Sequence, residues 1–197
     1  TASAIDEDDS SWSYTSNELA VTVAPLLSMS GEGVGEGSEF TLALTNTGLT
    51  GTTWTIDWGD GETEEMAEDA TSATHTYADG DAPDTTYTIT ATVDSAQGNY
   101  EVPQTVAVIS NVAPELTVSG DATVDVGADY MLTLSSEDPG SDTISQWRID
   151  WGDGSDPEDV DGSLSSVVHQ YALAGDYTIT ASAIDEDDSS WSYTSNE

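Results

Sequence analysis

Apolar and polar residues alternate along much of this chain with a period of two. Five segments show the alternation, with aromatic or aliphatic residues at every second position: 40–44, 54–58, 87–93, 130–134 and 147–151. Since successive side chains of a β-strand point to opposite faces, this pattern predicts half-buried strands. No segment holds the three- and four-residue apolar spacing of a helix for long enough to form one, so the predicted fold class is all-β.

Turn-forming residues separate these predicted strands at short intervals. About seven strands in roughly 90 residues, with turns between them, are typical of an immunoglobulin-like β-sandwich. Two turns have the sequence Gly-Asp-Gly, at 59–61 and 152–154, where glycine allows tight backbone angles and the aspartate caps the turn. We expect His75 and His169 to be hydrogen-bonded structural residues, and Tyr77 and Tyr171 to be core residues whose hydroxyls bond to nearby backbone.

The sequence repeats itself at two scales. Residues 1–18 recur unchanged at 180–197, an offset of 180 − 1 = 179 residues, which indicates a recent tandem duplication. Within that period lies a weaker repeat of about half the length. Its matched segments are 56–61 with 149–154, 75–77 with 169–171, 87–91 with 177–181, and 24–25 with 113–114.

The repeats predict three parts of the chain. Residues 1–23 are expected to be the C-terminal strands of a preceding domain, 24–112 a complete domain one, and 113–197 a domain two. Domain two lacks a counterpart of residues 19–23, which we predict to be the last strand. Either the next tandem copy supplies that strand within the same chain, which the repeat favours, or a neighbouring chain donates it.

In these motifs the chain resembles polycystic-kidney-disease (PKD) domains. The resemblance rests on the Trp-Gly-Asp-Gly, His-x-Tyr and Tyr-Thr-Ile-Thr motifs, which occur twice in the same order, at 58–61, 75–77 and 87–90 and at 151–154, 169–171 and 177–180. Domain one departs from the family pattern because Thr85 and Thr86, without a glycine, precede its last motif. The resemblance implies tandem immunoglobulin-like (PKD) β-sandwiches that serve as extracellular spacer, adhesion or protein-contact modules.

The charge of the chain restricts its partners. Asp and Glu number 39 against one basic residue, Arg148, which gives a formal net charge of -38. Nucleic acid is not an expected partner, because binding phosphates requires Lys and Arg, and anionic membrane surfaces are disfavoured for the same reason. No apolar run has the length of a membrane span, so no membrane insertion is expected. Such a charge favours cations, and we predict Ca²⁺.

The resemblance also implies where calcium would bind. In PKD-like domains that bind it, the ligands are a linker Asn, acids of the loop before the Trp strand, and the first Asp after the Thr-Ile-Thr strand. On this chain these are Asn111, Asp138, Asp142 and Asp185. Domain one is poorer, since its loop at 45–48 holds no acid and only Asp94 matches, so its site is expected to be weak or absent.

Other acids are expected to form only a solvated surface. They are Glu62, Glu64, Glu65, Glu68 and Asp69. A solvated surface is also the alternative to calcium for the acids of domain two, because acidic surfaces can act simply through solubility.

The expected function is that of a structural repeat unit in an extracellular fibre, stalk or surface layer, with calcium at the interdomain joints. The expected partners are neighbouring copies of the repeat, in tandem or laterally, and the expected location is extracellular or at the cell surface. Two alternatives are an accessory carbohydrate- or substrate-binding module of a secreted hydrolase, with Trp12 and Trp191 as sugar platforms, and a cell–cell adhesin. No catalytic motif is present, so an enzyme is not expected.

Overall fold

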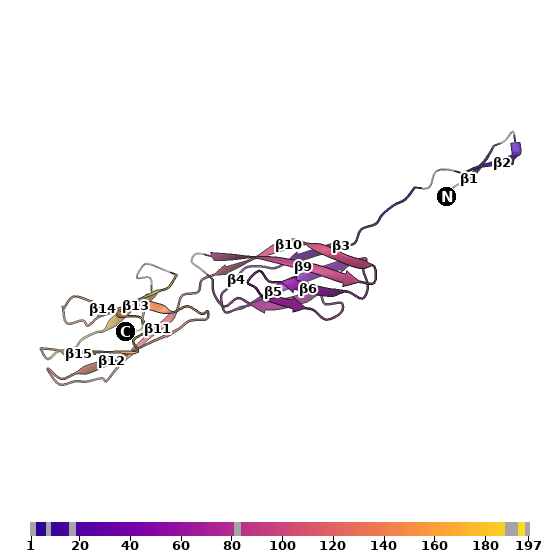
Figure 1. The fold of residues 1–197 in the computed structure, drawn as a ribbon. Coiled ribbons are helices and arrows are strands. Elements are labelled where there is room, and N and C mark those ends of the chain that lie inside the picture. The colour runs from indigo at the N-terminus through magenta and orange to yellow at the C-terminus, as the bar shows by residue number, and fades with distance from the viewer. Residues whose placement is uncertain (1–2, 7–8, 16–18, 81–83, 188–192, 196–197) are drawn as a thin grey trace.

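The protein is seen in a computed structural model that describes residues 3–6, 9–15, 19–80, 84–187 and 193–195. The described residues contain no helix. They form two β-sandwiches that follow one another along the chain, and a two-stranded hairpin that lies apart from both at the end of an extended segment (Figure 1). The hairpin consists of β1 (Ser3–Asp6) and β2 (Asp9–Thr15).

The first sandwich packs a three-stranded sheet against a five-stranded sheet. The smaller sheet has the order β3 (Leu26–Ser30), β5 (Glu39–Thr47), β8 (Ser72–Thr76). The larger has the order β4 (Val34–Gly35), β10 (Gly98–Ser110), β9 (Asp84–Ser95), β6 (Thr53–Asp57), β7 (Thr63–Glu65). Every second residue of β5 and β6 is buried, as the alternation predicts, and Phe40, Trp54 and Trp58 fill the space between the sheets.

The second sandwich repeats this plan with shorter strands. One sheet has the order β11 (Glu115–Ser119), β12 (Tyr130–Glu137), β15 (Ser166–His169). The other has the order β14 (Glu158–Asp161), β13 (Ile144–Asp150), β16 (Thr180–Asp185), β17 (Tyr193–Thr194). Trp147 and Trp151 occupy the core positions of Trp54 and Trp58.

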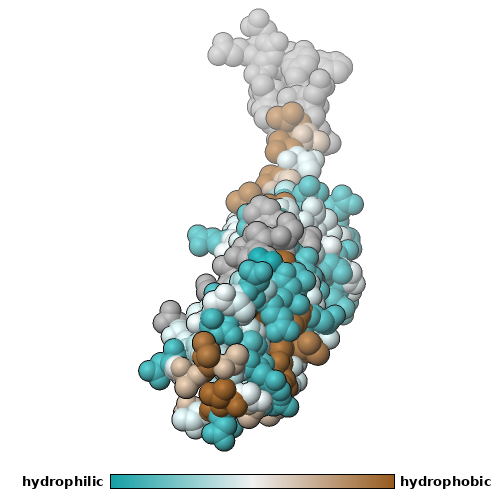
Figure 2. Space-filling view, turned by 90° about the vertical axis from the view of Figure 1, so that its left-hand side faces the viewer, coloured by the Kyte–Doolittle hydropathy of each residue, from teal (hydrophilic) through white to brown (hydrophobic). Residues whose placement is uncertain are grey.

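Residues 19–23, which the sequence predicts to be the last strand of a preceding domain, form no strand in this structure. Residues 19–25 are extended but belong to no sheet, and Leu19, Val21 and Val23 are 87%, 74% and 87% exposed. The reason is that a strand requires a neighbour to bond its backbone, and no described strand lies beside this segment. Figure 2 shows a brown, hydrophobic stretch directly below the grey atoms at the top of the view.

The Gly-Asp-Gly turns are held by the histidine of the next motif. In the first sandwich Asp60 accepts from the backbone N–H of Glu62 at 2.9 Å and pairs with His75 Nε2 at 2.6 Å. The His75 ring stacks on Trp58, and the Tyr77 hydroxyl donates to the Trp58 carbonyl oxygen at 2.9 Å. These contacts confirm structural roles for the histidine and the tyrosine.

The second sandwich reproduces this arrangement. His169 Nε2 lies 3.0 Å from Asp153 Oδ2, its ring stacks on Trp151, and the Tyr171 hydroxyl donates to the Trp151 carbonyl oxygen at 3.1 Å. Hydrogen bonds from Ser155 and His169 lower the pKa of Asp153 to about 2.

Candidate metal site between the two sandwiches

The four residues predicted to bind calcium lie at the end of the second sandwich that faces the first. Asn111 follows β10, Asp138 and Asp142 lie in the loop between β12 and β13, and Asp185 ends β16. The Asn111 side-chain N–H group donates to Asp142 Oδ2 at 3.1 Å and to Asp187 Oδ2 at 3.4 Å. The linker asparagine is therefore bound directly to the acidic loops of the second sandwich.

Asp138 and Asp185 shape the two acidic loops. Asp138 Oδ1 accepts from the backbone N–H of Gly140 at 2.7 Å, and Asp185 Oδ1 accepts from that of Asp187 at 3.1 Å. Asp185 is only 2% exposed, which is unusual for an acid. Each carboxylate thus fixes the turn that follows it and lies at the base of the joint.

The first sandwich contributes two acids that the sequence analysis did not single out. Glu36, which follows β4, is fully buried and accepts from the backbone N–H groups of Gly80 at 2.8 Å and Val112 at 2.6 Å. One carboxylate oxygen each of Glu36, Asp79 and Asp142 lie within 4.8 Å of one another. The acids that meet at the joint therefore come from both sandwiches.

A signal for Glu36 was present in the sequence. The backbone N–H of Gly37 bonds to the Tyr77 carbonyl, and that of Gly127 bonds to the Tyr171 carbonyl, so these glycines are counterparts. The residue before Gly127 is Val126, whereas the residue before Gly37 is an acid. An acid in one repeat, at a position where the other repeat has an apolar residue, indicates a role that only the first of them has.

Glycines allow the two sandwiches to approach closely at this joint. A Cβ atom on Gly37, whose φ is +66°, would lie 1.7 Å from the Pro139 carbonyl oxygen, and one on Gly140 would lie 2.7 Å from the Glu36 side chain. Neither distance is compatible with a side chain. The contact between Glu36 and the loop at 138–142 is therefore built into the backbone of both partners.

The acids at the joint disfavour one another's ionisation. Burial, followed by the charges of Glu36, Asp187, Asp138 and Asp79, raises the pKa of Asp142 to about 7. Burial and the Asp185 charge also raise the pKa of Asp138, against the hydrogen bond from Gly140. The described residues place no cationic side chain among these acids to offset the repulsion.

Two carboxylate oxygens at the joint lack hydrogen bonds, one on Asp142 and one on Asp138, which lies outside the group of Glu36, Asp79 and Asp142. Asp138 Oδ2 and Asp142 Oδ1 are buried and have no hydrogen-bond partner within the part of the chain that the structure describes. Buried carboxylate oxygens normally have partners, because leaving one without costs about 1–3 kcal/mol. A set of closely spaced oxygen ligands is what Ca²⁺ and similar hard cations require, so the residues fit a divalent cation.

Asp94 does not hold the place in the first sandwich that Asp185 holds in the second. Trp54 pairs with Val93 and Trp147 pairs with Ala183, so the counterpart of Asp94 is Ile184. Asp94 is exposed on the outer face of β9, because one position along a strand reverses the direction of the side chain.

All five acids assigned to the solvated surface are exposed, and one of them also makes a structural hydrogen bond. Asp69, in the left-handed conformation with φ +59°, accepts from the buried Thr52 hydroxyl at 3.2 Å. The other four, which include Glu62 and Glu68, are exposed as expected. Trp191 and the side chain of Trp12 lie outside the described residues.

The comparisons with known proteins agree with this architecture. The family model described as "PKD domain" matches residues 111–197. This segment therefore matches the PKD family. The first sandwich carries the same motifs in the same order and the same sheet arrangement, and we refer to it as PKD-like. The sheets of the two sandwiches and this match confirm the predicted all-β, immunoglobulin-like fold class, and PKD domains occur in extracellular proteins.

Solved structures with a similar fold were also found. The PKD domain of an M14-like peptidase from a Thermoplasmatales archaeon is 22% identical over 46% of this chain and 98% of its own, with a TM-score of 0.32. A two-domain fibronectin type-III segment from chicken tenascin is 18% identical over 86% of this chain and 95% of its own, with a TM-score of 0.46. Both scores are low, so these similarities carry no conclusion about function.

No curated protein matches the chain. Within the described residues, the structure has no helix with the length and hydrophobicity that crossing a membrane requires.

Proposed function

We propose that this chain is a non-catalytic structural repeat unit of an extracellular fibre, stalk or surface layer, in which calcium fixes the angle between successive sandwiches. The observation that carries the proposal is the meeting of Glu36 and Asp79 from the first sandwich with Asp142 from the second. A cation bound there would hold two domains rather than stabilise one, which is the property that a rigid spacer requires.

The electrostatics of the joint support a cation. The acids face one another across the contact, and burial, followed by the proximity of the other acids, raises the pKa of Asp142. A divalent ion would remove this repulsion and supply partners for Asp138 Oδ2 and Asp142 Oδ1. Because the ligands would come from both sandwiches, the ion would bind only when the two domains are held in contact. Binding would therefore stabilise this orientation of the domains by mass action.

Serial sandwiches also fit the repeat in the sequence. Modules that contact chiefly their neighbours add length and stability together, so a longer tandem array would remain rigid as it grows. The proposed partners are therefore neighbouring copies of the repeat, and the proposed location is the cell surface or the medium around it.

The test is a calcium titration of the purified chain, followed by calorimetry and small-angle X-ray scattering. Calcium is expected to raise the melting temperature and to narrow the distribution of interdomain distances, and a chelator is expected to reverse both effects. The variant Asp142→Asn should lose this response and keep its fold. Asp94→Asn is the matched control, because it also removes one carboxylate, and Asp94 is exposed at the end of β9 that lies away from the joint. This variant should respond to calcium as the unmodified chain does.

A melting temperature and scattering profile that calcium leaves unchanged would contradict the calcium joint. Equal responses of Asp142→Asn and Asp94→Asn would show that calcium acts on general surface charge instead.

A further inference from the structure

The smaller sheet of each sandwich carries almost no charge on its outer face. In the first sandwich, the outward residues of β3, β5 and β8 are all Ser, Thr or Ala, apart from Leu26 and Glu39. In the second, those of β11, β12 and β15 are Ser, Thr, Met131 or Val168, apart from Glu115 and Glu137. We call these two surfaces the neutral faces.

The acids of the neutral faces lie at their ends. Glu39 is the first residue of β5, and Glu115, the first of β11, pairs with Glu137, the last of β12. Past the opposite end of the second neutral face, Asp129 accepts from the Gln170 side-chain N–H group at 2.6 Å. Between these ends, each neutral face presents hydroxyl and apolar groups to solvent.

The larger sheets have the opposite character. In the first sandwich, their outward residues include the acids Asp57, Glu65, Asp84, Asp94 and Glu101. In the second, they include Asp150, Asp159 and Asp161. Because 39 of the 197 residues are Asp or Glu, surfaces as large as the neutral faces would carry several acids if acids were spread evenly. The exclusion of charge from the same sheet in both repeats therefore indicates a role for that surface.

The second neutral face also has an exposed apolar pair. Met131 on the central strand pairs with Val168 on β15, and the two residues are 61% and 54% exposed. The first sandwich has the pair Thr41 and Thr74 at this place, since Thr74 and Val168 each precede the histidine of their motif. The apolar pair is thus specific to the second repeat.

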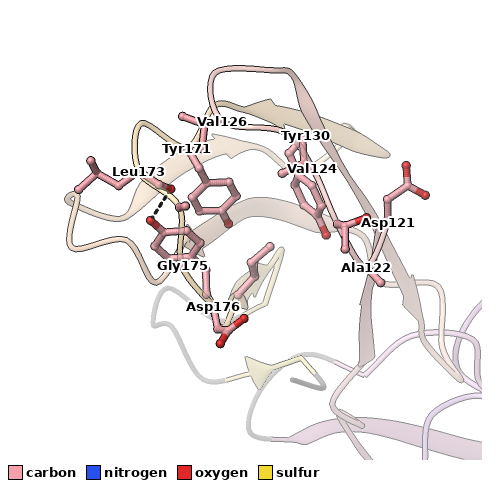
Figure 3. A pocket seen from close by; sticks show the side chains of 13 residues that line it. Asp121, Ala122, Val124, Val126, Tyr130, Tyr171, Leu173, Gly175 and Asp176 are labelled. Carbon is pink, nitrogen blue, oxygen red and sulfur yellow. Dashed lines mark hydrogen bonds between the residues drawn. The ribbon is translucent and has the colours of Figure 1, made fainter.

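The residue before Met131 points to the other side of the sheet. Tyr130 packs against the core and lines an open groove between residues 121–126 and 173–179 (Figure 3). The alternation of the strand places Met131 on the opposite side from Tyr130. The apolar pair therefore lies outside this groove, on a separate surface of the sandwich.

Hydroxyl groups allow a surface to pair with a copy of itself. A hydroxyl both donates and accepts hydrogen bonds, whereas an ionised carboxylate only accepts them. Two acidic faces would set acceptors against acceptors and repel one another, while two neutral faces can exchange hydrogen bonds. The neutral faces are also the surfaces through which two molecules of net charge -38 meet with the least repulsion.

We propose that the neutral face of the second sandwich packs against the same face of a second copy of the chain, with Met131 and Val168 buried at the contact. A surface that contacts its own copy gives a two-fold arrangement, which is the commonest among oligomers. A buried part without charge that contains Met matches the composition of interface cores. The neutral face of the first sandwich lacks the apolar pair and is expected to contribute less.

The contact is small, and its size sets the expected strength. Three strands about 4.8 Å apart, with five residues in β11, give a flat area of roughly 14 Å by 17 Å. A stable interface buries roughly 800 Å² on each partner, so single chains should associate weakly. In the tandem array of the proposed function, on which this step rests, repeated contacts would add up and join arrays side by side.

The first experiment is sedimentation velocity of the unmodified chain up to millimolar concentration, in chelator so that calcium has no part in it. Association that grows with concentration is expected. It should be stronger at about 1 M than at about 0.1 M salt, because salt shortens the range of the repulsion between acids from about 10 Å to about 3 Å.

Two matched variants locate the contact. Val168→Asp should weaken association by about tenfold or more, because it would bury a charge at the contact. Val106→Asp is the control, since Val106 is also a valine, is 47% exposed and lies on the outer face of β10, outside the neutral faces. It should associate as the unmodified chain does. Circular dichroism would verify that both variants remain folded, as expected for exposed positions.

A mixing experiment tests whether the face pairs with itself. Val168→Asp and Val168→Lys, mixed in equal amounts, should recover most of the lost association, because opposite charges would meet across the two-fold contact. The same mixture made at Val106 should associate no better than the unmodified chain. Failure of the Val168 mixture to recover would overturn the pairing of this face with itself.

Other outcomes would also overturn the proposal. One is an unmodified chain that stays monomeric at both salt concentrations. Another is an equal effect of Val168→Asp and Val106→Asp, because the contact would then lie elsewhere. Since chelator is present throughout, these outcomes are independent of the calcium joint, which the response to calcium tests separately.

Discussion

The two sandwiches contain the same four residues, Tyr-Thr-Ile-Thr, in different states. Residues 87–90 lie within β9, bonded on one side to β10 and, through Thr90, on the other to β6. Of residues 177–180, only Thr180 belongs to a strand. Ile89 is fully buried, whereas Ile179 is half-buried beside the groove. The difference shows that this sequence is compatible with a strand but becomes one only where a neighbouring strand bonds to it.

The joint shows a second difference between the repeats. Gly37 of the first sandwich and Gly127 of the second occupy equivalent positions. The residue before Gly37 is Glu36, and the residue before Gly127 is Val126. Glu36 is buried at the contact with the second sandwich, while Val126 is exposed at the groove. The same structural position thus serves a polar joint in one repeat and an apolar groove in the other.

The largest expected effect is at the core isoleucines. Ile89→Ala should destabilise the first sandwich by about 3 kcal/mol, because it leaves a cavity in a closed core. Ile179→Ala should cost the second sandwich only about 1 kcal/mol, because the side chain already borders an open groove. Calorimetry that resolves the two transitions would measure both. Equal losses would show that the groove is closed in solution.

Next in size are the glycines of the two Gly-Asp-Gly turns. Gly59→Ala and Gly152→Ala should each lower the free energy of unfolding by about 2 kcal/mol. Both glycines have positive φ, and an added Cβ atom would lie 2.5 Å from a carbonyl oxygen at Gly59 and 2.3 Å from one at Gly152. Gly61→Ala and Gly154→Ala are the controls, with positive φ and open space, and should cost about 1 kcal/mol. Urea unfolding would compare the pairs. Equal losses of stability at Gly59 and Gly61, or at Gly152 and Gly154, would contradict the close approach of the first glycine of each turn to a carbonyl oxygen.

A smaller effect is expected from pH in the absence of calcium. The pKa of Asp142 is about 7 in the folded protein and has an ordinary value of 3.8, so between these values the folded state binds more protons. Stability should therefore fall as the pH rises from about 4 to about 7, by on the order of 5 °C in melting temperature. Acids with lowered pKa, such as Asp153, are already ionised in most of this range.

Melting temperatures in chelator between about pH 5 and about pH 8 would measure this dependence. Asp142→Asn should remove it, and saturating calcium should suppress it. A melting temperature that rises over this range in the unmodified chain would contradict the repulsion at the joint.

The smallest effect is expected at Arg148. It forms a two-bond pair with Asp159, at 2.6 Å and 2.7 Å, on an exposed face where the first sandwich has Thr55. Because exposed ion pairs contribute little, Arg148→Thr should change the stability less than any of the substitutions above. Asp159→Asn provides the other half of a double-mutant cycle in urea. A coupling energy as large as the loss expected for Ile179→Ala would show that the second sandwich depends on a contact that the first does without.

By itself the sequence determined the all-β class and the motifs of both repeats. Period-two alternation places Trp54 and Trp147 in the cores, and glycine is favoured where a turn has positive φ, as at Gly59 and Gly152. These inferences depend on local geometry, which neighbouring residues specify. The resemblance to PKD domains, and not local geometry, implied Asn111, Asp138, Asp142 and Asp185 as a shared site, and the structure shows a hydrogen bond between Asn111 and Asp142.

Only the tertiary structure decided what happens between segments that are distant in the chain. It placed Glu36 and Asp79 at the joint, moved Asp94 to the outer face, and left residues 19–23 and 177–179 without strand partners. The physical reason is that strands and ion sites are completed by groups from elsewhere. A backbone hydrogen bond or a carboxylate cluster exists only where the fold brings both partners together.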